Sequence, residues 1–490
     1  MGFKANASFL RFLTMGALGV RSTMQELRRM GFKPIELERH CASNKIWTTK
    51  VKRLRLPDLL CVQTGLRLEV RAKSDLKIRM SDAPTNPDRV WDAGLRDSDL
   101  IAFIACFDGE DGMRAAEEAE YFTVEALRAS SDHTKLGQPK SASEGAERDR
   151  TWPTTVPSRP GRVLEVDGER IVVNMEGDDA PERRQTYRLN GKTPYVGVGD
   201  TFKADTMFIA GVPPRTASPL EYADRMYDPV SDLRADHPVD RYAAVKALPH
   251  REDRQAECLP ELVALIERAE DERIALEAAA TAAFLGSKRG EDYIRSVLTT
   301  DGRADLKMEA VFILGELGSD FARQVLASVA KDASRQGDEL RQAATWGLGK
   351  AGLGAYEELL ELIDDSEDEV AMHALVAFDR GAPDVIIAHL IQKLALSDGR
   401  TAAAASEALV QIGDERTIRA LATEPFDDSE ATAWRLVTLS RLPVELVDTL
   451  ITSPETRVAL APLRRLSGAL NWLADDEKRD DLSFLLKQSV

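Results

Sequence analysis

The sequence predicts a multidomain chain with an N-terminal α/β domain, a small β-barrel and a C-terminal all-α solenoid. Three observations predict it. The chain of 490 residues is too long for one ordinary domain. A helical pattern recurs through the C-terminal half, and strand-like runs separated by turn residues precede it. We expect the α/β domain at 1–128, a flexible linker at 129–160, the barrel at 161–215 and the solenoid at 235–490.

Charge is distributed unevenly along the chain. The net charge is −17, yet residues 1–80 hold 17 Lys and Arg against 6 Asp and Glu, so the other residues together carry −28. A locally basic domain suits contact with a polyanion, because phosphate contacts need clustered cations. A basic face docked on the acidic solenoid is the alternative. Four separated cysteines form no metal-ligand or disulfide pattern, and no apolar run is long enough for a membrane span, so a cytoplasmic protein is expected.

The solenoid is predicted from five copies of one template, which has an aliphatic or small residue followed at steps of four by Ala, an apolar residue and a small residue. The copies begin at Ile274, Leu306, Leu340, Val370 and Thr401. Steps of four align one face of a helix, and Ala lets a neighbouring helix approach closely. A second apolar helix follows each copy, at 293–298, 322–329, 356–363, 385–394 and 417–421. Weaker copies near 241–248 and 432–442 suit terminal repeats.

These hairpins resemble short HEAT-like repeats over about 250 residues. The resemblance implies a curved surface that binds protein or nucleic acid. Catalysis by the repeats themselves, as in HEAT-like phycobilin lyases, has no supporting feature in the sequence. We therefore expect an unknown protein partner at the solenoid.

Between the two ends, the sequence predicts strands and a linker. Residues 162–166, 170–174 and 207–210 read as strands, with turns at Asp167-Gly168, Asn190-Gly191 and Gly199-Asp200. The turn around Gly199 is similar to that of barrel-sandwich domains. Residues 129–159 are rich in Ser, Gly, Pro, Lys and Glu and lack apolar periodicity, which is typical of a linker.

The first 128 residues predict a helix, several strands, a short helix and a buried strand. We expect the first helix at 15–30, strands at 34–38, 53–62 and 66–73, the second helix at 90–96 and the last strand at 100–106. Gln63-Thr64-Gly65 would join two strands as a hairpin. This order predicts an α/β layer with a mixed sheet.

The hairpin carries the residues that suggest catalysis. Asp58 follows Pro57, Glu69 lies on the next strand, and Glu69, Arg71 and Lys73 alternate onto one face. Two carboxylates from adjacent strands can hold Mg²⁺ or Mn²⁺, and a nearby cation can orient water or neutralise a phosphate.

This set resembles the PD-(D/E)xK, restriction-endonuclease-like nucleases. The resemblance implies that Asp58 and Glu69 bind the metal ion and that a lysine assists the attacking water. The family expects that lysine two residues after the glutamate, where this chain has Arg71, a poor base. Lys73, two residues further on the same face, is the candidate replacement, and the assigned catalytic set is Asp58, Glu69, Arg71 and Lys73.

A basic run leads into Asp58 and continues after the hairpin. We assign it to DNA-backbone contact, with Trp47 available for a base or sugar. The assigned cations are Lys45, Lys50, Lys52, Arg53, Arg55 and Lys77. A solvated strand face is the alternative. Glu26 on the first helix is interpreted as a surface charge, with an additional acidic group near the metal ion as the alternative. His373 is interpreted as a structural residue inside a repeat.

The preferred hypothesis is a metal-dependent DNA endonuclease in prokaryotic defence or repair, with a solenoid that recruits or regulates. No P-loop is present, so a motor would be a separate protein. The alternatives are a noncatalytic nucleic-acid-binding adaptor and a protein scaffold. Loss of activity at Arg71 would give the first of these.

Overall fold

A computed structural model gives the fold. It describes residues 7–37, 47–49, 54–109, 112–140, 147–176, 183–268, 271–300, 302–335, 337–350, 354–396, 399–423 and 429–466. The chain divides into two compact units: 11–40 with 53–281, and 1–10 with 41–52 and 282–490. We call them the sheet unit and the solenoid unit. Among the described helices, none combines the length and the apolar character needed to cross a membrane.

The sheet unit is built around a curled mixed sheet. Its strands run in the order β1-β2-β3-β5-β6, and β7 also pairs with β5. Strands β1 to β3 form an antiparallel meander, and β3 runs parallel to β5. The bounds are β1 Pro34–Glu36, β2 Leu59–Cys61, β3 Leu66–Lys73, β5 Leu100–Gly109, β6 Gly112–Ala115 and β7 Glu120–Thr123.

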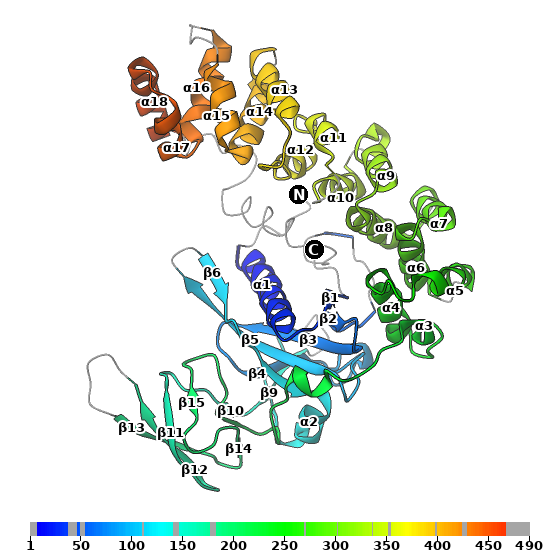
Figure 1. The fold of residues 1–490 in the computed structure, drawn as a ribbon, viewed down its shortest axis with the longest axis vertical. Coiled ribbons are helices and arrows are strands. Elements are labelled where there is room, and N and C mark those ends of the chain that lie inside the picture. The colour runs from blue at the N-terminus through cyan, green and yellow to red at the C-terminus, as the bar shows by residue number, and fades with distance from the viewer. Residues whose placement is uncertain are drawn as a thin grey trace. The chain divides into compact units, whose positions relative to one another are not determined.

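Helix α1 (Ala7–Arg29) packs on one face of this sheet (Figure 1). Gly19 permits the contact, because a Cβ there would lie 2.8 Å from the Cβ of Ala72 on β3 and 3.1 Å from Cγ2 of Ile104 on β5. Phe103 projects from the other face and packs against Phe122 and Phe208. The predicted first helix, mixed sheet and 63–65 turn are confirmed, and Gly65 adopts a φ of 66°.

Two local predictions in this unit are wrong. Residues 54–57 lie outside β2, since Pro57 has no N–H to donate to a neighbouring strand. Residues 90–96 form no helix; a short 3₁₀ turn, η2 (Pro87–Arg89), and further turns replace it. Gly94 adopts a φ of 78°, and a Cβ there would collide with the carbonyl oxygen of Arg55. The close approach of these two segments therefore determines the backbone conformation at Gly94.

The segment expected to be a linker forms strands in its described part. Strands β4 (Ile78–Asp82), β9 (Arg148–Trp152) and β8 (Lys135–Leu136) make a three-stranded sheet. Helix α2 (Val124–Ala129) and η3 (Ser131–His133) lie between β4 and β8 in the sequence. Trp152 is fully buried, and its indole N–H donates to the Leu127 carbonyl. One buried tryptophan thus anchors a stretch whose composition is that of a linker.

A small β module follows, with a core of its own. Its four-stranded sheet has the order β13-β12-β11-β15, and a three-stranded sheet has the order β10-β16-β14. Val163, Val173 and Phe202 lie in the shared apolar core. Two sheets around one core replace the single barrel that we expected. The bounds are β10 Thr154–Thr155, β11 Gly161–Val166, β12 Arg170–Met175, β13 Arg183–Arg188, β14 Thr193–Pro194, β15 Thr201–Phe202 and β16 Ala210–Gly211.

The C-terminal region is all helical. Its bounds are α3 Pro229–Asp232, α4 Pro238–Ala247, α5 Gln255–Arg268, α6 Glu272–Phe284, α7 Lys288–Thr299, α8 Ala304–Leu317, α9 Asp320–Ala330, α10 Glu339–Leu348, α11 Tyr356–Leu360, α12 Asp368–Leu375, α13 Asp384–Leu396, α14 Gly399–Ile412, α15 Glu415–Ala422, α16 Glu430–Arg441, α17 Val444–Leu450 and α18 Pro454–Leu466. Short 3₁₀ turns are η4 Pro219–Tyr222, η5 Leu248–His250 and η6 Ala333–Arg335.

The predicted repeat is confirmed. Each copy of the template begins a repeat on α6, α8, α10, α12 or α14, and α7, α9, α11, α13 and α15 follow as second helices. In the solenoid unit, α8, α10, α12, α14 and α16 pack in succession (Figure 1). A Cβ on Gly315 would lie 3.3 Å from the Cα of Gly347, so small residues let α8 and α10 approach closely. Gly318 ends α8 in the left-handed conformation.

Candidate functional site

Asp58 lies at a bend directly before β2, and Glu69 lies on β3. The β2–β3 register pairs Leu59 with Leu68, so Asp58 and Glu69 are the next residues beyond this pair. Each residue is only 8% exposed. The Asp58 carboxylate accepts a hydrogen bond from the Val70 N–H at 2.6 Å. The predicted carboxylate pair therefore lies where β2 and β3 separate.

Arg71 forms an ion pair with the Glu69 carboxylate. Its guanidinium nitrogen lies 2.5 Å from Oε1 of Glu69, and the Glu69 side chain is 11% exposed. A buried carboxylate requires a compensating charge, and Arg71 supplies it. The residue that departs from the nuclease pattern thus neutralises one of the two assigned metal ligands.

Lys73 lies two residues further along β3 and is half-buried. Burial, followed by the positive charges of Arg71 and Arg79, lowers the pKa of Lys73 to about 7. A large fraction of this amine is therefore neutral near pH 7. Such a lysine can accept a proton, which is the chemistry that Arg71 cannot provide.

The fit of a metal ion can be judged from the donor set. Two carboxylates are a suitable protein contribution for Mg²⁺, which keeps waters in its remaining positions. Glu69 is already paired with Arg71, however, so an ion would compete with a guanidinium. Over the described ranges, no group of three or more His, Cys, Asp or Glu side chains is arranged to hold a metal.

The assigned DNA-binding cations are only partly within the described residues. Arg55 is exposed beside the loop that contains Gly94. Lys77 is also exposed and forms an ion pair with Asp75. The remaining four, Lys45, Lys50, Lys52 and Arg53, lie outside the described residues.

Glu26 is not the surface charge that we expected. It is buried, and its carboxylate accepts hydrogen bonds from the Tyr121 hydroxyl at 2.7 Å and the Ala119 N–H at 3.0 Å. Burial raises its pKa, although these two hydrogen bonds act in the opposite direction. Glu26 thus ties α1 to β7 rather than joining the Asp58 pair.

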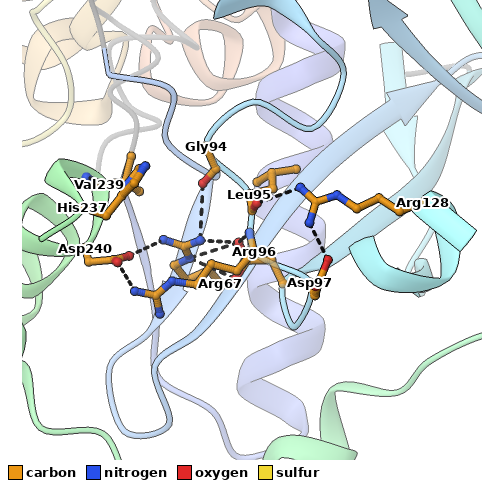
Figure 2. Close-up of polar contacts among 10 residues, drawn as sticks. Arg67, Gly94, Leu95, Arg96, Asp97, Arg128, His237, Val239 and Asp240 are labelled. Atoms are coloured by element: carbon orange, nitrogen blue, oxygen red, sulfur yellow. Dashed lines mark hydrogen bonds and ion pairs between the residues drawn. The ribbon is translucent and has the colours of Figure 1, made fainter. Parts of the chain in front are cut away.

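A second charged group on β3 was not expected from the sequence. Arg67, on the same face as Glu69, donates to both carboxylate oxygens of Asp99 and, at 2.8 Å, to Asp240 (Figure 2). Arg96 also pairs with Asp240, and the Arg67 side chain is only 3% exposed. The network joins the sheet to α4, the first helix of the first hairpin, inside the sheet unit.

Apolar contacts support the same junction. Leu60 and Val62 of the sheet share a core with Ala243 and Ala247 of α4. Asp240 and Arg67 are 173 residues apart in the sequence, and neither belongs to a local pattern. No sequence signal could therefore have found this junction before the fold was known.

The second candidate site lies in the solenoid unit, around Trp47. This side chain is 3% exposed and contacts three rings on successive first helices: Phe312 of α8, Trp346 of α10 and His373 of α12. The ring centroids lie 5.7, 6.4 and 5.7 Å from that of Trp47. We call Phe312, Trp346 and His373 the aromatic pocket. Trp47 is buried there, so its expected role in contacting a nucleic-acid base is wrong for this state.

One carboxylate holds the two residues after Trp47. Glu339, the first residue of α10, accepts hydrogen bonds from the Thr48 N–H at 2.5 Å, the Thr48 hydroxyl at 2.9 Å and the Thr49 N–H at 2.7 Å. Charge-assisted bonds of this kind are stronger than neutral ones. The Glu339 carboxylate therefore holds a bend at Thr48 and Thr49 through two backbone amides and one hydroxyl.

His373 adds no charge to the pocket. The side chain is completely buried, and burial lowers the pKa of His373 to about 3. The expectation of a structural histidine is compatible with this environment. One sequence signal could have indicated the pocket, because Phe312 and Trp346 each lie six residues after the start of their template copy.

A family comparison agrees with the helical repeats. The family of HEAT repeats matches residues 291–379. No curated protein matches the chain. Among solved structures, the complex of CpcE and CpcF of phycocyanin lyase from Nostoc sp. PCC7120 is similar, with a TM-score of 0.26 and 16% identity over 49% of this chain and 95% of that chain.

The C-terminal region is thus a HEAT-repeat region, preceded by a β-rich region with a curled mixed sheet. These matches give no support for a PD-(D/E)xK nuclease domain.

Proposed function

We propose that this protein is a noncatalytic adaptor whose HEAT-repeat region binds segments of partner proteins. One observation carries the proposal: the solenoid unit holds Trp47, Thr48 and Thr49 through an aromatic pocket and a carboxylate. Recognition of a peptide segment by an aromatic anchor and backbone hydrogen bonds is a general mode of binding.

The charged face of β3 supports the noncatalytic part of the proposal. Glu69 is paired with Arg71, and Asp58 accepts the Val70 N–H. Arg67 is committed to Asp99 and Asp240. These groups satisfy one another inside the fold, as expected of charges that stabilise the domain and join it to the first helical hairpin.

A site-specific crosslinking experiment tests the adaptor proposal. A photoreactive residue would be placed at Gln324 on α9 or Ala388 on α13, both exposed, and at exposed Gln185 on β13 as the control. We expect one common partner to be captured from both solenoid positions in cells and not from Gln185. Capture from Gln185 alone would contradict the proposal.

A second candidate function is metal-dependent cleavage of DNA in defence or repair. Two observations favour it: Lys73, with a pKa of about 7, lies on the same face of β3 as Glu69, and β3 and β5 are parallel strands of a mixed sheet. In this proposal Asp58 and Glu69 would hold Mg²⁺ or Mn²⁺, and Lys73 would assist a water molecule.

Cleavage assays separate the two candidates. The purified chain would be incubated with linear, supercoiled and single-stranded DNA and either metal ion, beside Glu69→Gln and Lys73→Ala. The adaptor proposal predicts no cleavage by any of the three proteins. Cleavage by the unaltered chain that both substitutions abolish would establish the nuclease and refute the noncatalytic adaptor.

A further inference from the structure

The segment in the aromatic pocket comes from a distant part of the sequence. Residues Thr48 and Glu339 are 291 positions apart, and Trp47–Thr49 belong to neither a helix nor a strand. Their contacts include those of the Trp47 indole with three rings and three hydrogen bonds to the Glu339 carboxylate. A contact of this kind is a ligand-like interaction within one chain.

We propose that the aromatic pocket is a binding site for a basic segment of a partner protein that bends at the pocket, and in which a tryptophan precedes a threonine or serine. Trp47–Thr49 is then the chain's own competing ligand. The inference rests on the proposed function and specifies its partner chemistry and regulation. A partner segment must displace the internal one before it binds.

The contacts in the pocket specify which residues the partner segment needs. The indole of Trp47 contacts His373 at an interplanar angle of 32° and meets Trp346 edge-on at 89°, so a planar ring fits between them. Glu339 accepts from two successive backbone N–H groups, which excludes proline at either position. It also accepts from the Thr48 hydroxyl, which favours Thr or Ser there.

Charge complementarity favours basic flanking residues. The internal ligand is surrounded in sequence by Lys45, Lys50, Lys52 and Arg53, whereas residues 81–490 carry the −28 balance of the chain. Attraction between a basic segment and an acidic protein raises the association rate and weakens with salt.

An internal ligand lowers the apparent affinity for an external one. A tethered segment competes at an effective concentration that reaches the millimolar range for short flexible linkers. If the pocket is mostly self-occupied, removal of the internal tryptophan raises the affinity for an added peptide by about tenfold or more. This gain separates an exchangeable ligand from a fixed structural contact.

The test measures binding of a fluorescent peptide with the sequence of residues 43–53 to the full-length chain by anisotropy. The unaltered protein is compared with Trp47→Ala, whose folding is checked by circular dichroism. We expect Trp47→Ala to bind the peptide at least about tenfold more tightly. A peptide carrying the same Trp47→Ala change should bind neither protein. Equal affinity of the two proteins for the native peptide would overturn the proposal.

Further variants keep the test decisive if Trp47→Ala misfolds. Thr48→Pro keeps the tryptophan but removes the Thr48 N–H and hydroxyl, so it should also increase peptide affinity. Adding Glu339→Gln to either variant should weaken binding, whereas Glu357→Gln, at an exposed position on α11, should not. Unchanged binding in Glu339→Gln would contradict the assigned pocket. If peptide binding fails while crosslinks persist at Gln324 and Ala388, this pocket is refuted and the adaptor proposal remains.

Discussion

The charged face of β3 and the aromatic pocket of the solenoid unit satisfy their buried groups in different ways. On β3, Arg67 and Glu69 are paired with charges held by the same compact unit. In the pocket, Phe312, Trp346 and His373 are covered by a side chain from a segment remote in sequence. The charges on β3 are thus neutralised within their own unit, whereas the pocket holds Trp47 as a receptor holds a ligand.

This difference has an energetic origin. Removing one partner from a buried ion pair leaves an uncompensated charge, so such networks are costly to open. Removing one ring from an aromatic pocket exposes no uncompensated charge, because another apolar group or water can take the place of the ring. We therefore expect exchange at the pocket and rigidity at the β3 network.

The largest effect should follow the substitution Arg67→Ala. It leaves the buried Asp99 carboxylate without its guanidinium partner and leaves Asp240 with Arg96 alone, so we expect a loss of about 3–5 kcal/mol in the free energy of unfolding of the sheet unit. Denaturant unfolding, followed by probes in this unit, measures the change.

The matched control for Arg67 is Arg11→Ala. Arg11 pairs with Asp108, but their side chains are 52% and 64% exposed, so no resolvable loss is expected. Equal destabilisation by Arg11→Ala and Arg67→Ala would show that the buried network has no special role.

Lys73 should titrate near pH 7. Its folded pKa lies below the ordinary lysine value of 10.5, so the unfolded chain binds the extra proton between these two values. Stability from this group therefore rises as pH increases from about 7 to 10.5 and is lowest below pH 7. NMR of isotope-labelled lysine side chains measures the midpoint directly, with Lys73→Met for assignment. A midpoint near 10.5 would remove the support for a neutral amine beside Arg71.

A smaller effect is expected at the edge of the pocket. Glu339→Ala removes the acceptor of the Thr48 and Thr49 amides, so exchange of their hydrogens with solvent should accelerate by about tenfold or more. Hydrogen-exchange mass spectrometry of fragments that contain these residues measures it. Glu357→Gln serves as the control, and unchanged protection in Glu339→Ala would contradict the assigned contact.

The smallest effect is expected for Arg71→Lys. This change places lysine where the nuclease pattern has it, and the adaptor account predicts no DNA cleavage with Mg²⁺ or Mn²⁺. Gel assays beside Glu69→Gln measure the outcome. Cleavage gained by Arg71→Lys and lost again in the double variant would show that only one residue separates this face from a nuclease.

The sequence was sufficient where local periodicity determines structure. Steps of four identified the first helices of the repeats, because the same residues form each buried face. Alternation along 66–73 likewise placed Glu69, Arg71 and Lys73 on one face. Whether these residues act on nucleic acid stays a prediction.

The sequence was insufficient where distant segments meet. Gly94 was assigned to a helix because its approach to Arg55 could not be foreseen. Composition indicated a linker around Trp152, although this side chain is buried in the sheet unit. The neighbours of Trp47 lie more than 260 positions away, so only the repeated Phe312 and Trp346 positions offered a clue.

The most direct test of the central claim follows Trp47 itself by ¹⁹F NMR. The full-length chain would be labelled with 5-fluorotryptophan, the Trp47 signal assigned among the six tryptophans with Trp47→Phe, and the unlabelled 43–53 peptide added. The account predicts a buried Trp47 signal without peptide that gives way to a solvent-exposed signal as the peptide saturates. A Trp47 signal that stays buried at saturating peptide would contradict it.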